Sequence, residues 1–500
     1  MGLGRVYAVA VVGIDGVLVE IEADVRSGLP GVNVVGLPDA ALQESRDRVR
    51  SAVVNSGEQW PRQKVVLALS PASLPKVGSV YDLALACAVL DASRAVPRTR
   101  LDNVAFLGEL ALDGRLKSVR GLLPAVLGAR RAGRERVVVP AAGLPEAGLV
   151  PGIDVLGAHH LREVTAWLRG ADNLMAPAPI APEPAPGGPD LADVVGQEHA
   201  RTALEIAAAG AHHILLTGPP GVGKTMLAQR LPGLLPELTD AESLEVTAVH
   251  SVAGILPVDR PLVRRPPFVA PHHTSTATSL TGGGSGMALP GAVSRAHRGV
   301  LFIDECPEMS IRALEALRTP LEEGEVRVTR AKGEARYPAR FQLVLAANPC
   351  PCAPARPEDC VCPPAARRRY LGRLSGPLLD RVDLRIALRP PTGGVLLDAA
   401  CEPTERVRER VVEARARAAH RWREGGWTTN AEVPGPVVRR SYLDARAALA
   451  PIEVALRRGL ITSRGADRAM RVALTVSDLA HKPRPDDGDV LSALSFRNHG

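Results

Sequence analysis

Eight consecutive residues form the pattern G-x-x-x-x-G-K-[ST], which is typical of a phosphate-binding loop. The pattern follows a short apolar stretch, 213–217, and precedes a helix-forming stretch, 226–230. Glycines let backbone N–H groups approach phosphate oxygens, and the N-terminus of the helix adds positive potential. We therefore predict a nucleoside-triphosphate site formed by Gly218, Pro219, Pro220, Gly221, Val222, Gly223, Lys224 and Thr225.

Charged and hydroxyl side chains at this site have distinct expected roles. Lys224 would reach the β- and γ-phosphates, and Thr225 would hold Mg²⁺. Further along the chain, the apolar stretch 300–303 ends in Asp304 and Glu305. Carboxylates at the end of a buried parallel strand lie at the ligand edge of the sheet. We expect Asp304 to bind Mg²⁺ through its water and Glu305 to polarise the attacking water.

Asn348 follows a third strand of the buried type, 341–347, which we expect to lie beside the other two. An amide at this place can orient the attacking water by hydrogen bonding. A simple turn at the end of the strand explains an asparagine there equally well.

Four cysteines crowd into a short segment, at Cys350, Cys352, Cys360 and Cys362. Four thiolates can hold one tetrahedral Zn²⁺ in a structural site, although the C-x-C spacing is tighter than the usual C-x₂-C. Reduced loop cysteines or a redox-sensitive pair are the alternatives. The total of seven cysteines is odd and does not fit a secreted disulfide framework, so we predict a cytoplasmic protein.

The length of 500 residues predicts two to four domains, since a domain takes about 150 residues. Hydrophobic residues make up 46% of the chain, but no run of 18 apolar residues occurs, so we expect no membrane partner. The formal charge of +7 permits an acidic partner such as nucleic acid.

The elements that must position these residues fall into four segments. We predict an α+β or α/β domain over 1–172 and a Pro/Ala-rich linker over 173–189. Alternating apolar strands and helices over 190–398 predict an α/β core with a parallel sheet. Residues 399–500 predict a closing helical domain, in which the arginine-rich helix 405–423 would be solvated and paired with its own glutamates.

These motifs, taken in order, resemble the magnesium-chelatase-like branch of the AAA+ ATPases, and most closely the ComM/YifB family. The resemblance covers essentially the whole chain and implies a P-loop AAA+ core with a C-terminal helical lid that uses ATP and Mg²⁺. The strings that carry it include Val194–Gln197, Ala270–Thr274, Ala296–Glu305, Asn348–Cys352 and Ser375–Asp383.

The resemblance also assigns roles to single residues. Asn348 is identified as the sensor-1 residue and Arg381 as the arginine finger that reaches the γ-phosphate of a neighbouring subunit. Arg464 resembles sensor 2, and Arg468 is a substitute one turn further on. Because one subunit would supply charge to the next, the resemblance implies a ring, expected to be a hexamer.

A hairpin is predicted between 324–329 and 335–341, and its tip carries Arg330 and the rare lysine Lys332. In related rings such a hairpin points into the central pore. We expect Lys332 or Arg330 to contact DNA phosphate; a solvated hairpin tip is the alternative.

The N-terminal domain resembles the Lon-protease-type fold, of the ribosomal S5 domain 2 type. The positions that match the Lon serine and lysine are Val80 and Leu123, and neither side chain can serve in that chemistry. Ser79 and Lys117 lie nearby in sequence, but the matched positions predict a domain that is proteolytically inactive.

The resemblance implies a ring-forming motor acting on single-stranded or branched DNA, as a helicase or branch-migration factor in recombination or natural transformation. The alternative is a chelatase-type ATPase that remodels a protein partner for Mg²⁺ insertion into porphyrin. An ATP-dependent protease is disfavoured by Val80 and Leu123.

Overall fold

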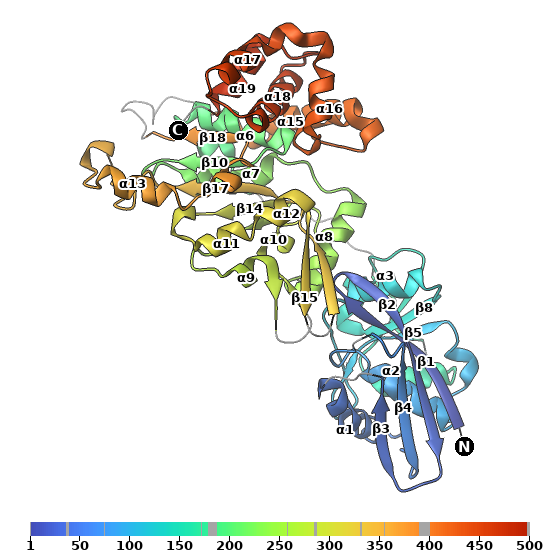
Figure 1. The fold of residues 1–500 in the computed structure, drawn as a ribbon. Coiled ribbons are helices and arrows are strands. Elements are labelled where there is room, and N and C mark those ends of the chain that lie inside the picture. The colour runs from blue at the N-terminus through green and yellow to red at the C-terminus, as the bar shows by residue number, and fades with distance from the viewer. Residues whose placement is uncertain are drawn as a thin grey trace.

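The computed structural model contains three bodies in a row, with the N-terminal sheet at one end and the C-terminal helices at the other (Figure 1). No helix among the residues that it describes is both long enough and apolar enough to span a bilayer. The described residues are 2–36, 40–74, 76–171, 173–178, 188–257, 259–284, 288–330, 333–354, 356–389 and 401–497.

The N-terminal body is built on a seven-stranded mixed sheet of order β3-β4-β2-β1-β5-β8-β9. Its centre is a long antiparallel hairpin of two strands whose apolar residues alternate between the faces of the sheet. The seven strands are β1 (Gly2–Val12), β2 (Asp15–Arg26), β3 (Gly31–Val35), β4 (Lys64–Ser70), β5 (Val104–Phe106), β8 (Arg136–Pro140) and β9 (Asp154–Ala158). A small separate hairpin pairs β6 (Glu109–Leu110) with β7 (Leu116–Lys117).

Helices cover both faces of this sheet, because the side chains of a strand alternate between its faces. On β1, Val6, Ala8 and Ala10 belong to one hydrophobic cluster and Val9 to the other. The first cluster includes helices α1 (Ala40–Asn55), α2 (Asp82–Ala92) and α5 (Leu161–Leu168), and the second includes α3 (Leu122–Arg131) and α4 (Leu144–Ala147).

The middle body contains a five-stranded sheet of order β11-β14-β17-β10-β18, in which every neighbouring pair is parallel. This confirms the predicted α/β core with a parallel sheet. The strands are β11 (Phe268–Val269), β14 (Val300–Ile303), β17 (Gln342–Ala347), β10 (Ile214–Thr217) and β18 (Leu384–Ala387). Because all five run in one direction, their carboxyl ends meet at a single edge.

Alternation along these strands divides the core between two faces. Leu216, Phe302 and Val344 face a cluster that includes helices α6 (Glu198–Gly210) and α7 (Lys224–Leu234). Leu301 and Leu343 face the other cluster. That second face is lined by short helices and a hairpin: α9 (Ala277–Thr281), α10 (Ala292–Arg295), α11 (Ile311–Glu315), α12 (Arg318–Glu323), β15 (Glu325–Arg330) and β16 (Gly333–Pro338).

The C-terminal helices share the hydrophobic cluster that contains α6 and α7, with Val411, Val472 and Val490 buried in it. They are therefore packed onto the core rather than linked loosely to it. These helices are α15 (Thr404–Trp422), α16 (Gly435–Ser441), α17 (Ala450–Arg457), α18 (Ser463–Leu479) and α19 (Asp487–Ser495).

Helix α8 (Asp240–Ala253) belongs to the middle body and contacts the N-terminal one. Figure 1 shows α8 beside α3 of the N-terminal body. Ala248 lies in the same cluster as the residues of α3, and the Gly121 N–H donates to the carbonyl of Ser251 at 3.3 Å. The Ser251 hydroxyl also donates to the carboxylate of Glu146. Burial raises the pKa of Glu146, so this contact holds a carboxyl group away from water.

The predicted segment boundaries remain predictions. The proposed boundary at 398/399 lies within 390–400, and the centre of the proposed linker lies within 179–187, both outside the described residues. At the start of that linker, Met175 forms an antiparallel bridge with Gly157 and so continues the N-terminal body.

Candidate functional site

The predicted phosphate loop lies between β10 and α7, at the edge where the parallel strands end. Gly221 and Gly223 have φ angles of 78° and 93°, in the left-handed region where a side chain is strained. The helix begins at Lys224, immediately after the loop. The unpaired N–H groups of its first turn are thus directed at the place that the loop encloses.

The ammonium group of Lys224 makes three hydrogen bonds, two within the loop and one to Asn348 at the end of β17. Its Nζ atom donates to the carbonyls of Gly218 at 2.7 Å and Pro219 at 2.9 Å, and to Oδ1 of Asn348 at 3.0 Å. Burial lowers the pKa of Lys224, and the carboxylates of Asp304 and Glu305 oppose that shift. An ammonium group has three N–H donors, so all three are in use.

Thr225 and Asp304 are brought together across the sheet edge. The Thr225 hydroxyl donates to Oδ2 of Asp304 at 2.8 Å, although the two residues are far apart in sequence. Glu305 follows with φ at 46° and ψ at 42°, a left-handed conformation that is uncommon outside glycine. Its backbone N–H donates to Oδ1 of Asp304 at 2.9 Å, and its half-exposed side chain faces outwards from the strand end.

His273 lies next to Glu305, a contact that the sequence did not predict. Its Nδ1 atom is 3.5 Å from Oε2 of Glu305, and its ring centroid is 4.1 Å from that of His272. The segment 270–274 precedes strand β14 by more than twenty residues in sequence. Only the folded chain brings it to the Glu305 carboxylate.

The donors present fit a magnesium-bound nucleoside triphosphate. The loop backbone, the α7 N-terminus and Lys224 offer positive charge to phosphates, and the hydroxyl and carboxylate of Thr225 and Asp304 are hard oxygen ligands suited to Mg²⁺. Lys224 now donates to two loop carbonyls. Phosphate oxygens are acceptors of the same kind, so Lys224 can donate to them in place of the carbonyls when nucleotide binds.

The three arginines expected to act on phosphate lie at the opposite edge of the same sheet. His213 immediately precedes β10, and its carbonyl accepts the Asp383 N–H at 3.0 Å. Asp383 in turn pairs with Arg468 at 2.6 Å. The phosphate loop begins only after β10 ends, and strand β10 covers four residues at about 3.3 Å each. A strand length therefore separates Arg468 from the phosphate loop of its own chain.

Arg381 and Arg464 belong to this same group. Arg464 lies 3.4 Å from Asp380, and Arg468 donates to the carbonyl of Arg381 at 3.1 Å. Arg381 pairs with Glu322, and its Nε atom is buried without a partner. All three arginines line a cleft of about 810 Å³ between the core and the C-terminal helices.

The two residues predicted to contact DNA, Arg330 and Lys332, belong in sequence to the tip of the predicted hairpin. Lys332 lies outside the described residues, and of Arg330 only the backbone at the end of β15 is described. The hairpin itself is confirmed, with β15 and β16 paired in register from Glu325↔Pro338 to Arg330↔Gly333. Its base is anchored by the buried hydroxyl of Tyr337, which donates to the Ala288 carbonyl.

Among the described residues of the N-terminal body, Ser79 and Lys117 both contact Glu109. The Ser79 hydroxyl donates to the carboxylate of Glu109, and Lys117 lies 3.9 Å from that carboxylate. A lysine base would have to accept the serine proton, whereas here a carboxylate does so. Leu123, at the matched lysine position, is fully buried in the core.

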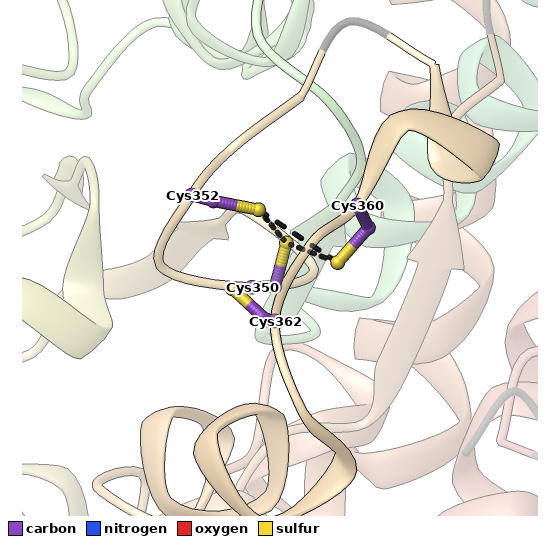
Figure 2. Close-up of side chains that lie close together, drawn as sticks. All are labelled: Cys350, Cys352, Cys360 and Cys362. Carbon is purple, nitrogen blue, oxygen red and sulfur yellow. Dashed lines mark hydrogen bonds between the residues drawn. The ribbon is translucent and has the colours of Figure 1, made fainter.

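The four clustered cysteines come together in space. Their Sγ atoms all lie within 4.8 Å of one another, and Figure 2 shows them directed towards a common centre from two arms of one loop. All seven cysteines of the chain are free thiols.

Family models for the magnesium chelatase subunit ChlI match three successive parts of the chain. The model described as magnesium chelatase, subunit ChlI, matches residues 190–395, and that of its C-terminal region matches 401–497. A third model, described as subunit ChlI of Mg-chelatase, matches 21–143 in the N-terminal body.

Relatives similar over the full length include an uncharacterized protein of Mycobacterium tuberculosis, which is 62% identical over 100% of this chain and 99% of its own. YifB of Escherichia coli is 40% identical over 99% of this chain and 97% of its own. Competence protein ComM of Haemophilus influenzae is 38% identical over 99% and 98%. The chain belongs to the ComM/YifB family. Membership of this magnesium-chelatase-like family indicates an ATPase, which uses ATP and Mg²⁺.

Chelatase subunits themselves match the ComM/YifB chain only in part. The magnesium-chelatase 38 kDa subunit of Rhodobacter capsulatus is 31% identical over 31% of this chain and 49% of its own. The likeness to ComM and YifB thus extends over the N-terminal body, whereas this match leaves most of the chain uncovered.

Proposed function

We propose that this protein is an ATP-hydrolysing, ring-forming motor that acts on DNA, with a ComM-like role as a helicase or branch-migration factor. The observation that carries the proposal is the assembly of Lys224, Thr225, Asp304, Glu305 and Asn348 at one sheet edge. Likeness to ComM and YifB over nearly the whole chain supports the same role.

Each residue of the site has a separate task in hydrolysis. Lys224 and the α7 N-terminus hold the phosphates, and Thr225 with Asp304 holds Mg²⁺. Bound ATP supplies the γ-phosphoryl group, and its Mg²⁺ neutralises charge on the phosphate oxygens. Glu305 accepts the proton of the attacking water, and the Asn348 amide orients that water by hydrogen bonding.

The three arginines support a ring. Arg381, Arg464 and Arg468 gather at the far edge of the sheet, a strand length from the phosphate loop of their own chain. To act on phosphate of a neighbouring subunit they would exchange their partners Glu322, Asp380 and Asp383 for it, and a head-to-tail interface forms a ring when its rotation closes. We expect a hexamer, as the family resemblance implies.

DNA as the substrate has two supports. The relative from Haemophilus influenzae is a competence protein by name, and the formal charge of this chain is +7. The hairpin of β15 and β16 ends in Arg330 and Lys332, which we expect to contact phosphates of a strand in the pore.

A chelatase-type role, in which ATP turnover remodels a protein partner for Mg²⁺ insertion into porphyrin, is the second candidate. The names of the matching family models favour it. The partial coverage of the chelatase 38 kDa subunit weighs against it.

The test is ATP turnover and strand displacement with forked, single-stranded and four-way-junction DNA, using Glu305→Gln as the inactive control. A DNA motor predicts turnover that rises with DNA and branch movement that is lost in the variant. Turnover indifferent to every DNA would contradict the DNA role and favour remodelling of a protein partner. No turnover in the unmodified protein would contradict the ATPase assignment itself.

A further inference from the structure

The four clustered cysteines have the spacing of ligands to a single metal ion. Three Sγ–Sγ distances are 3.4 Å (Cys350 to Cys352), 3.7 Å (Cys352 to Cys360) and 3.4 Å (Cys350 to Cys360). A tetrahedral Zn²⁺ with Zn–S bonds of about 2.3 Å holds its sulfurs about 3.8 Å apart. The sulfur atoms therefore already lie near the corners of a zinc tetrathiolate, with Cys362 completing the set (Figure 2).

We infer that Cys350, Cys352, Cys360 and Cys362 bind one structural Zn²⁺. Four protein ligands close the coordination sphere, so the ion has no open position for water or substrate. An iron–sulfur cluster is a poorer fit, because several irons and bridging sulfides must lie between the thiolates and push them further apart. The metal assignment does not depend on the proposed function.

The loop that carries the cysteines has little else to hold it. Among the described residues between β17 and helix α13 (Pro364–Leu371), the only regular element is a three-residue 3₁₀ turn, Pro357–Asp359. Prolines at several positions remove backbone N–H donors that could otherwise tie the loop together. Val361, between two of the cysteines, is 86% exposed. A metal crosslink supplies the order that a hydrophobic core would give a larger unit.

The crosslink would join the segment that follows Asn348 to the start of helix α13. Cys350 follows Asn348 by two residues, and Cys362 precedes α13 by two residues. At the other end of α13, Tyr370 is buried, and Arg373 lies 3.6 Å from Glu308 in the turn that follows Glu305. The ion would therefore tie the end of β17 to α13, which leads to Arg373 and its ion pair with Glu308.

Zinc content of the purified full-length protein tests the site directly. We expect one zinc per chain by elemental mass spectrometry, and under about 0.1 in the Cys352→Ser/Cys362→Ser variant, since two ligands of four are lost. Cys401→Ser is the matched control, because Cys401 is a partly exposed thiol outside the cluster, and it should keep its zinc.

A second measurement keeps the test valid if the double variant fails to fold. Unmodified protein stripped of metal and refilled with Co²⁺ should show the visible spectrum of a tetrahedral tetrathiolate. Protein that neither contains zinc as purified nor takes up Zn²⁺ or Co²⁺ overturns the inference. Iron in place of zinc, or a mass deficit that reveals disulfides among the four cysteines, overturns it equally.

The consequence for turnover rests on the proposed function. Loss of zinc should lower the ATP turnover number about tenfold through misplacement of Asn348, with nucleotide affinity changing by less than about threefold. Because zinc content is measured without ATP, an inactive enzyme that holds one zinc would contradict the proposed function and leave the metal site standing. Zinc loss with unchanged turnover would refute the role of the ion in positioning Asn348 and would leave the metal site itself standing.

Discussion

Lys224 shares its three N–H donors between two loop carbonyls and Asn348, so the loop and the end of β17 are linked through one ammonium group. Without Asn348 this link would lose its side-chain acceptor. The same amide can also donate a hydrogen bond to the attacking water through its nitrogen. Under the proposed function one side chain would have two roles, and substitution can separate them.

Asn348→Ala removes both roles, whereas Asn348→Asp keeps an oxygen acceptor for Lys224 and loses the amide donor. If the amide orients the attacking water, both variants should lower the ATP turnover number by about 10²-fold with little change in nucleotide affinity. Steady-state turnover and binding of a fluorescent ATP analogue measure the two effects. An aspartate variant with near-normal turnover would show that Asn348 acts only by holding Lys224.

Element by element, several contacts differ from what the local sequence pattern led us to expect. The arginine-rich helix α15 pairs Arg417 with its own Glu413 at 3.5 Å, as predicted, but other arginines of the helix reach α6. Arg410 binds Glu205 on α6 at 2.7 Å, and Arg415 donates to the carbonyl of Ala208 at 2.9 Å. Arginine side chains have enough reach and donors to fasten one helix to another while α15 buries its apolar stripe.

The tip of the β15–β16 hairpin is the element expected to contact DNA. Lys332→Glu should lower the ratio of DNA-stimulated to unstimulated ATP turnover severalfold, because a carboxylate repels the phosphate backbone. The ratio is measured over a series of salt concentrations, and the variant should show a weaker salt dependence. Lys64→Glu, at the exposed first residue of β4 in the N-terminal body, makes the same charge change far from the hairpin. Equal loss in both variants would refute a specific hairpin contact.

The junction of β10 and β17 should carry a pH dependence. Nδ1 of His213 accepts the Leu343 N–H at 3.1 Å, which requires a neutral ring. Desolvation lowers the pKa of His213 to about 4 from an ordinary 6.5, with Asp383 opposing the shift and Arg468 and His212 adding to it. Because the folded-state pKa is depressed, this stability is full above pH 6.5 and is lost as the pH falls towards 4.

His213→Asn tests this junction, since the Asn Oδ1 atom can accept the same N–H and does not titrate. Between pH 7.5 and pH 5, the thermal midpoint should fall by less in this variant than in the unmodified protein. His420→Asn, at an exposed histidine on α15, should leave the fall unchanged. Parallel curves for all three proteins would contradict the assignment.

At the scale of the whole molecule, the phosphate loop and the arginine group lie on opposite edges of one sheet. Under the proposed function, a single chain would present half of a site at each edge, and a complete site would need two subunits. The N-terminal body is held to the core through α8 and α3, so it would take a fixed place on each subunit of the ring.

Mixing two inactive variants tests this division. Lys224→Ala removes the phosphate-binding side and Arg381→Ala the arginine side, so each protein alone should have little turnover. Random mixed rings should recover about a quarter of normal turnover, because one interface in four joins an intact loop to an intact arginine. ATP turnover after subunit exchange measures the recovery. A mixture as inactive as its parts would contradict sharing between subunits.

The sequence by itself predicted the strands of the core that precede the site and the residues that we expect to bind phosphate. Short continuous apolar stretches predicted the strands before Gly218, Asp304 and Asn348, because the composition of a strand is a local property. Only the tertiary structure decided which distant segments meet. His273 reaches Glu305, and Arg464 lies beside Asp380 at the far edge of the sheet, because strand order and crossover connections set those neighbours. No pattern within a single segment records that order.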